Sequence, residues 1–321
     1  MRNMPKRHKP RRGSLEYWPR KRARRIYPRQ HFLPSKELKP LGFAAWKAGM
    51  TYVQLVDNNS QSPTYGKTIT RAVTVLDAPP LLVCGMRFYK KTDKGFVTSG
   101  EKWMEKMPEN LMKKVNKQKG SLSKEDFDDV RLIVATQPEK SGMRKKKPEV
   151  FEIAVGEDDI KKKIDYCESL LGKEIAARDV FRSGEFIDVS AVTKGHGFTG
   201  PVKRFGIRIQ RRKDQQHHRH AGSIGTTTPG KIDWRVPQSG QYGFFTRTEI
   251  SKEILAIDDD SKRVNPKGGF LGYGLAHSFI MIEGSVPGPR KRLIRLRKAS
   301  RKKKFEPVDL KFISLESKQG V

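Results

Sequence analysis

The segment from residue 193 to residue 248 most constrains how this chain can fold. It interleaves glycine with cationic side chains and shows little periodicity over more than forty residues. A compact domain rarely holds such a stretch, so we expect the segment to leave the domain that carries it. It can then thread among closely packed phosphates, which folded RNA presents and a smooth duplex does not. The glycines that permit this path are Gly195, Gly197, Gly200, Gly222, Gly225, Gly230, Gly240 and Gly243.

The same segment contains a pattern that resembles a dinucleotide-binding loop. Gly195, Gly197 and Gly200 satisfy the spacing G-x-G-x-x-G and follow a strand-like run at 186–192. That loop requires a helix to begin at the third glycine, where its N–H groups hold a pyrophosphate. Residues 205–210 instead alternate between apolar and polar side chains as in a strand, so we expect no helix there. The pattern therefore does not favour a dinucleotide-dependent enzyme, which stays as an alternative.

The charge of the chain indicates a polyanionic partner. The formal net charge is +32 in 321 residues, and the sequence pI is about 10.2. Self-repulsion of that size opposes compaction unless a polyanion neutralises it. The cations are also unevenly placed: residues 1–40 hold fourteen Lys and Arg against two acids, residues 285–304 hold ten against none, and residues 194–220 hold eight against one. Residues 92–179 are close to neutral, with nineteen Lys and Arg and eighteen Asp and Glu, so we expect them to face solvent.

Several classes of protein are disfavoured by the same composition. Cys84 and Cys167 stand alone in apolar surroundings, which predicts buried thiols in a reducing cytoplasm and neither disulfides nor a zinc site. No apolar run approaches a membrane span, and the polybasic start has no apolar signal core, so we expect a soluble protein that is not secreted. No nucleophile stands beside a general base, and we expect no enzyme, no metal and no cofactor.

Periodicity predicts a mainly β protein with an α/β insertion. Strand patterns occupy 41–46 and 50–56 as a pair, then 69–77, 81–89, 130–136, 150–155, 186–192, 253–257, 269–274, 278–283 and 293–297. One helix is predicted where Ile160, Ile164, Cys167 and Leu171 share a face, with an acidic first turn at 157–159 and a stop at Gly172.

Long motifs in chain order resemble the ribosomal large-subunit protein three family. They are TKGHGFTGPVKRFGI (193–207), GSIGTTTPGK (222–231), GQYGFFTRTEI (240–250), GGFLGYG (268–274) and GSVPGPRKRLIRLRKA (284–299). LGFAAWKAGMTYV near residue 41, VATQPEK near 134 and KKKPEVFEIAVG near 145 resemble the archaeal and eukaryotic branch.

The resemblance implies a fold, a location and partners. It implies a six-stranded β-barrel core, an inserted α/β subdomain, and long basic N-terminal and central extensions. It implies a structural constituent of the large subunit in the cytoplasm that binds large-subunit rRNA, nucleates assembly of its 3′ domain and extends toward the peptidyl-transferase centre. Neighbouring large-subunit proteins, among them protein fourteen, are the implied protein partners, with no membrane and no small-molecule substrate. The implied division is 1–40 (N-terminal extension), 41–91 (barrel), 92–179 (insertion), 180–192 (barrel strand), 193–248 (central extension) and 249–321 (barrel and basic C-terminal segment).

One motif departs from the family pattern. Archaeal and eukaryotic members usually carry Trp before a proline at the tip of the central extension, where this chain has Thr226, Thr227 and Thr228 before Pro229. A role assigned to that Trp cannot be transferred to these threonines. Trp234 lies nearby in another register and is a candidate for stacking on a base.

The candidate RNA-binding residues are the cations and histidines of the three basic regions. The histidines at 217, 218 and 220 lack a further metal ligand, which favours phosphate or base contact over a metal site. The candidates are Arg11, Arg12, Arg20, Arg22, Arg24, Arg25, Lys194, His196, Lys203, Arg204, Arg208, Arg211, Arg212, Lys213, His217, His218, Arg219, His220, Lys231, Arg247, Arg290, Lys291, Arg292, Arg295 and Arg297. A basic DNA-binding or chromatin-like protein is the second alternative, although no helix-turn-helix, zinc or bZIP pattern is present.

Overall fold

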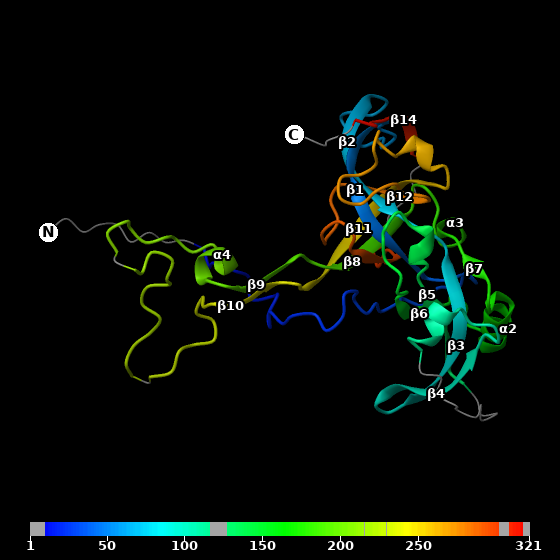
Figure 1. Cartoon of the computed structure of the whole chain (residues 1–321), viewed down its shortest axis with the longest axis horizontal. Helices are drawn as coiled ribbons and strands as arrows, with labels where there is room; N and C mark the ends of the chain where they lie inside the picture. Colours follow the sequence, from blue (N-terminus) through cyan, green and yellow to red (C-terminus); the bar gives the residue numbers. More distant parts are fainter. Residues whose placement is uncertain (1–9, 116–126, 215, 229, 302–307, 317–321) are drawn as a thin grey trace. The chain divides into compact units, whose positions relative to one another are not determined.

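The computed structural model describes residues 10–115, 127–214, 216–228, 230–301 and 308–316. These residues belong to two compact units, and Figure 1 labels most of their helices and strands. Unit 1 consists of Met1–Arg25 and Val192–Thr246, and unit 2 consists of Ile26–Ala191 and Arg247–Val321. Each unit therefore combines segments that are far apart in the sequence.

Unit 2 is built on two β-sheets, the larger of which has seven strands in the order β13-β8-β11-β12-β2-β1-β14. Strand β13 pairs with β8 and also with β1. The bounds are β1 (Gly42–Val56), β2 (Thr68–Asp77), β8 (Phe186–Val192), β11 (Thr246–Asp258), β12 (Phe279–Glu283), β13 (Leu293–Lys298) and β14 (Asp309–Ile313). The prediction of a mainly β protein is confirmed.

Strand β1 corrects the prediction of two strands at 41–46 and 50–56. It is one strand of fifteen residues, and its pairing with β2 shifts between Lys47 and Gly49. Such a bulge inserts an extra residue without ending the strand, which is why the apolar alternation breaks there. A Cβ on Gly49 would lie 2.5 Å from Cδ1 of Phe270, so only glycine fits beside that ring.

The second sheet combines β3 with strands of the segment predicted as an insertion, residues 92–179. Its strands run in the order β4-β3-β5-β6, and β7 pairs with β3. The bounds are β3 (Leu81–Thr92), β4 (Gly95–Trp103), β5 (Asp129–Ala135), β6 (Val150–Ala154) and β7 (Glu174–Ile175), with α1 (Glu109–Met112), η1 (Pro138–Lys140) and α3 (Ala177–Val180) between them. Strands β4, β7 and β14 were not predicted.

The helix predicted near residue 160 is confirmed as α2 (Ile160–Leu170). The acidic run precedes the helix instead of forming its first turn, and Asp159 caps it by accepting a hydrogen bond from the Lys161 N–H at 3.0 Å. Gly172 follows with a φ of +75°, a conformation that favours glycine.

One predicted strand is wrong. Residues 269–274 form a tight turn closed by the bridge between Phe270 and Gly274, because Gly269, Gly272 and Gly274 all have positive φ. The short 3₁₀ segment η2 (Ser261–Arg263) lies just before this turn in the chain.

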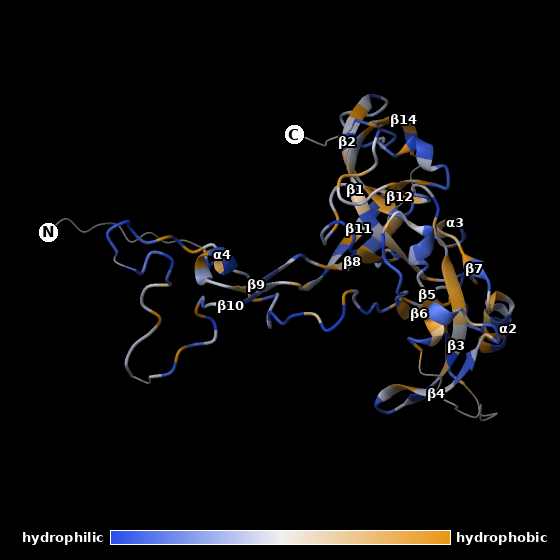
Figure 2. Ribbon diagram, viewed as in Figure 1, coloured by the Kyte–Doolittle hydropathy of each residue, from blue (hydrophilic) through white to orange (hydrophobic). Residues whose placement is uncertain are grey.

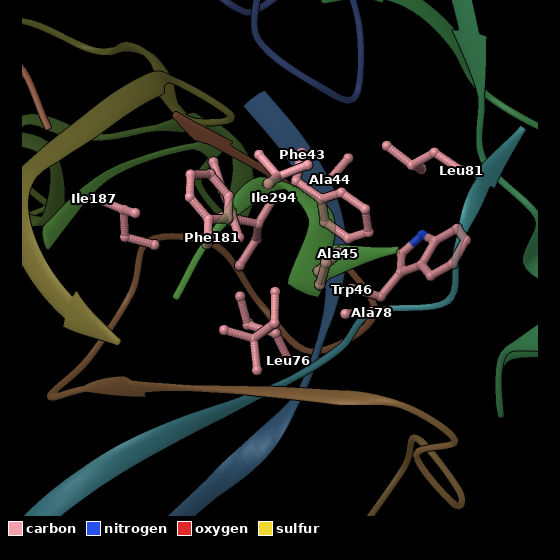
Figure 3. Packing of buried hydrophobic residues seen from close by; sticks show 14 of the residues in the cluster. Phe43, Ala44, Ala45, Trp46, Leu76, Ala78, Leu81, Phe181, Ile187 and Ile294 are labelled. Carbon is pink, nitrogen blue, oxygen red and sulfur yellow. The ribbon is translucent and has the colours of Figure 1, made fainter. Parts of the chain in front are cut away.

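The core of unit 2 is continuous across both sheets. Figure 3 shows Phe43, Phe181 and Ile294 close together, with Trp46 toward Leu81. Both cysteines are free and buried, as predicted, and burial raises the pKa of each thiol to about 12. Figure 2 shows apolar residues along β3, whereas the loops of unit 1 are mostly hydrophilic. Within the described residues, no helix combines the length and apolar character required to cross a membrane.

Candidate nucleic-acid interface

Unit 1 is held at its base by two short antiparallel strands. Strand β9 (Gly195–Thr199) pairs with β10 (Gly240–Gly243), so the residues between them form one excursion that leaves and returns at the same place. Gly243 has a φ of +71°, and a Cβ there would lie 2.1 Å from the carbonyl oxygen of Lys194. A glycine is therefore required where the two strands meet.

A short helix begins where none was predicted. Helix α4 (Pro201–Phe205) follows Gly200 directly and ends at Gly206, whose φ is +65°. Pro201 fits the first helical position, and Pro201 and Phe205 are both buried. The strand predicted at 205–210 is wrong, because Phe205 ends the helix and residues 206–210 lie in neither a helix nor a strand. The dinucleotide pattern gains no support, because β9 lies in an antiparallel pair and α4 has only five residues.

The N-terminal arm, defined here as residues 10–25, packs against α4. The Arg20 guanidinium lies 4.4 Å from the centre of the Phe205 ring and donates a hydrogen bond to the Arg204 carbonyl oxygen at 3.0 Å. The Trp18 ring stacks on Phe205 at 6.1 Å and meets the edge of Trp234 at 5.1 Å. Stacked rings and guanidinium groups thus form a small core in a segment with few aliphatic side chains.

Two more contacts join the arm to the central segment. The Ala23 N–H donates to the Phe244 carbonyl oxygen at 2.9 Å, and the Arg22 guanidinium lies 5.3 Å from the Phe244 ring centre. Arg11 donates to the Arg235 carbonyl oxygen at 2.8 Å. The packing role of Trp18 and Arg20 was missed from the sequence, because their partner Phe205 lies almost two hundred residues away.

Most cations of unit 1 remain on its surface. Its described residues include seventeen Lys and Arg but only Glu16, Asp214 and Asp233 as acids, so most of this charge has no acidic counterpart within the unit. The exposed candidates are Arg11, Arg12, Arg22, Arg24, Arg25, Lys194, Lys203, Arg208, Arg211, Arg212, Lys213, Arg219 and Lys231.

Arg204 differs from these exposed cations. Its side chain donates to the carbonyl oxygens of Gln241 at 3.1 Å and Gln238 at 2.9 Å. Burial lowers the pKa of its guanidinium. Arg204 therefore holds α4 to the strand that returns from the excursion, and its capacity for a phosphate is reduced.

The histidines of unit 1 form local pairs. The Nδ1 atoms of His217 and His220 lie 3.2 Å apart, Nδ1 of His218 lies 3.2 Å from the Gln210 carbonyl oxygen, and His196 stacks on Tyr242 at 5.1 Å. Among the described residues, no three His, Cys, Asp or Glu side chains gather where they could hold a metal ion.

Two aromatic side chains and the threonine tip face outward. Phe198 is 80% exposed and Trp234 is 58% exposed, which leaves both side chains accessible for stacking on unpaired bases. The Thr226 hydroxyl donates to the Thr228 carbonyl oxygen at 2.6 Å, and the following Pro229 lies outside the described residues.

The C-terminal candidates, which lie in unit 2, divide into exposed and structural residues. Arg290 and Lys291 are exposed, while Arg247 and Arg292 are partly buried, and burial lowers the pKa of Arg292. Arg295 is only 2% exposed.

Arg295 and Arg297 are engaged inside unit 2. Arg295 lies 3.9 Å from the Phe151 ring centre and donates to the Glu152 carbonyl oxygen at 2.9 Å. Arg297 donates to Asp188 through Nε at 3.2 Å and Nη2 at 2.9 Å. The structure thus places both candidates in the scaffold instead of on an open surface.

Comparison with known proteins decides the family. The family model described as ribosomal protein L3 matches residues 4–129 and 118–320, which together span almost the whole chain. The chain belongs to the ribosomal protein L3 family.

Curated relatives in the ribosomal protein L3 family cover almost the full length. Large ribosomal subunit protein uL3 of Methanopyrus kandleri is 46% identical over 333 residues, covering 98% of this chain and 92% of the relative. The proteins of the same name from Methanothermobacter thermautotrophicus and Methanococcus aeolicus are 45% and 43% identical, covering 99% and 98% of this chain and 100% and 99% of the relatives.

Membership confirms the resemblance seen in the sequence motifs. A ribosomal protein L3 is a structural protein of the large ribosomal subunit and not an enzyme, and its place is the ribosome in the cytoplasm. The dinucleotide-dependent alternative is thereby excluded, and ribosomal RNA and ribosomal proteins are the class of partner to consider.

Proposed function

We propose that this member of the ribosomal protein L3 family binds large-subunit rRNA directly, with unit 1 as its main contact surface. The observation that carries the proposal is the excess of seventeen cations over three acids in the described residues of unit 1. A surface of that composition, with most cations exposed, requires a polyanion to neutralise it.

The mechanism is electrostatic and mechanical. Each Lys or Arg that meets a phosphate releases condensed counterions, which favours binding and makes it depend on salt. Exposed Phe198 and Trp234 add stacking on unpaired bases, which tolerates any base. The aromatic core around Phe205 keeps the N-terminal arm beside the central segment, so both present cations together.

The more specific roles that the family resemblance implies are part of the same proposal. We assign to this chain the nucleation of the 3′ domain of large-subunit rRNA, a central extension that approaches the peptidyl-transferase centre, and contact with neighbouring large-subunit proteins including protein fourteen. We retain the division at residues 40, 91, 179, 192 and 248 for the extensions, barrel and insertion, except that β3, which pairs in the second sheet, goes with the insertion. The pairing of β13 with both β8 and β1 supports a closed barrel of β1, β2, β12, β11, β8 and β13.

Equilibrium binding to rRNA tests the proposal. The RNA is a transcript of the 3′ part of the large-subunit rRNA of Methanothermobacter thermautotrophicus, and duplex DNA of equal length is the control. We expect tighter binding to the rRNA at every salt concentration, because a folded RNA offers crevices between phosphates that a duplex lacks. Equal affinity for the DNA would favour the chromatin-like alternative.

Sedimentation provides a second test in the cell. Tagged protein should remain with large subunits through a gradient at high salt. Recovery with free nucleic acid, and not with large subunits, would overturn the proposed role.

A further inference from the structure

The inserted segment contains a run of four cations, Arg144 to Lys147, between η1 and β6. We propose that Arg144, Lys146 and Lys147 form a second phosphate-binding surface for rRNA, located in unit 2. The proposal rests on the proposed function, since it takes rRNA as the partner. It also revises the expectation that residues 92–179 only face solvent.

The loop that carries these cations, residues 142–149, is held by ion pairs of Glu149. Glu149 pairs with Lys114 and Lys145, and not with Arg144, Lys146 or Lys147. Its carboxylate is 15% exposed, and it accepts hydrogen bonds from Lys145 at 2.6 Å and Lys114 at 2.7 Å. Burial alone would raise the pKa of Glu149, but these two partners outweigh it and lower the pKa. Glu149 is therefore an anchor that is already saturated by two charges.

Backbone contacts fix the loop at both ends. The Glu149 N–H donates to the Thr136 hydroxyl at 2.9 Å, and the Thr136 N–H donates back to the Glu149 carbonyl oxygen at 2.9 Å. At the other end, the Gly142 N–H donates to the buried Asp77 carboxylate at 3.2 Å. A loop that is already ordered loses little conformational entropy when it binds.

Three cations project from this anchored loop. Arg144, Lys146 and Lys147 are exposed, and none of them has an ion-pair partner within the described part of the chain. The apolar residues that flank them turn inward, since Pro148 is buried and Met143 packs on the core. The loop therefore offers charge without an apolar contact surface.

That composition favours phosphate over a protein partner. Protein interfaces are depleted in lysine and enriched in aromatic side chains at their centre, whereas phosphate contacts use Lys and Arg directly. A residue of the basic N-terminal region (1–40) also contacts the first residue of β6, which follows this loop in the chain. The Tyr27 hydroxyl donates to the Val150 carbonyl oxygen at 2.7 Å, and Arg29, two residues further on, is exposed.

Charge-neutralising variants of the full-length chain test this surface. Arg144→Gln, Lys146→Gln and Lys147→Gln are combined in one variant. The matched control combines Lys161→Gln, Lys162→Gln and Lys173→Gln, three exposed lysines of the same inserted segment. Affinity for the Methanothermobacter thermautotrophicus rRNA transcript is measured from about 50 to 400 mM KCl, the range in which counterion release is resolved.

We expect the loop variant to reduce the slope of log K against log salt by about 2 to 3, and the control to reduce it by less than about 1. At 0.1 M salt the loop variant should bind the rRNA roughly ten- to a few hundredfold more weakly, since each lost phosphate contact lowers the affinity by up to about eightfold. Circular dichroism melts should coincide with wild type, because exposed substitutions rarely alter stability.

Two results would overturn the inference, and they are distinguishable. If wild type binds the rRNA with a steep salt slope and the loop variant keeps that slope, the loop is not an RNA contact and an acidic protein becomes its partner instead. If wild type itself shows no salt-dependent preference for the rRNA, the proposed function fails and this inference fails with it.

Discussion

Asp188→Ala should destabilise unit 2 substantially, because this carboxylate accepts hydrogen bonds from two distant parts of the chain. Its side chain is fully buried. It accepts hydrogen bonds from the Ser251 N–H at 3.0 Å, the Ser300 N–H at 3.0 Å, and Arg297 at 2.9 and 3.2 Å. Strand β8 is thereby joined to β11 and to the end of β13.

The expected loss follows from what the substitution leaves behind. Removing one partner of a buried ion pair costs about 3–5 kcal/mol, mostly because the other charge stays uncompensated. Arg297 remains 19% exposed and also donates to the His31 carbonyl oxygen, so we place Asp188→Ala near 3 kcal/mol, the lower end. A unit of this size should then melt about 6–12 °C lower.

Guanidinium denaturation followed by far-UV circular dichroism measures this loss. Lys298→Gln is the control: Lys298 pairs with Glu37 at 3.2 Å, but both side chains are well exposed, so we expect at most about 1 kcal/mol. Arg297→Gln should destabilise like Asp188→Ala while leaving the salt slope of rRNA binding unchanged. An unfolding free energy of Asp188→Ala within about 1 kcal/mol of wild type, or a salt slope that Arg297→Gln reduces by about 1, would contradict these scaffold roles.

Three further outcomes test other parts of the structure. Combining Arg208→Gln, Arg211→Gln and Arg212→Gln should reduce the salt slope of rRNA binding by about 2 to 3 without changing the melting temperature, and an unchanged slope would remove these residues from the interface. Gly243→Ala should open unit 1 to protease faster than Gly197→Ala; both glycines have positive φ, but only at Gly243 would a Cβ meet backbone, and equal cleavage rates would contradict this. Glu149→Gln should cost about 1 kcal/mol at neutral pH. Because the pKa of Glu149 is lowered from 4.5 on folding, its contribution is present above pH 4.5 and is lost as the pH falls through the folded pKa; a wild-type-minus-variant difference in unfolding free energy that stays constant in acid would refute this.

Local patterns predicted the elements whose signals are contained within a few residues. The apolar run 186–192 matches β8 at both ends, and the helical spacing from Ile160 with Gly172 as its stop matches α2 closely. Elements that depend on pairing with strands far away in the sequence were not predicted correctly. Strand β1 continues through its bulge because β2 pairs with it on both sides of Ala48, and β14 exists through its pairing with β1.

The candidate interface also has features that the sequence predicts and features that only the tertiary structure decides. The excess of cations, the glycines that allow an irregular path and the motifs of the ribosomal protein L3 family are properties of the chain itself, so the sequence alone identified the family and indicated a polyanionic partner. Which cations face that partner depends on tertiary structure. Arg295 and Arg297 look like surface cations in the run RKRLIRLRK, yet Phe151 covers the first and Asp188 binds the second. Charge belongs to the side chain, whereas its burial depends on neighbours that only folding brings together.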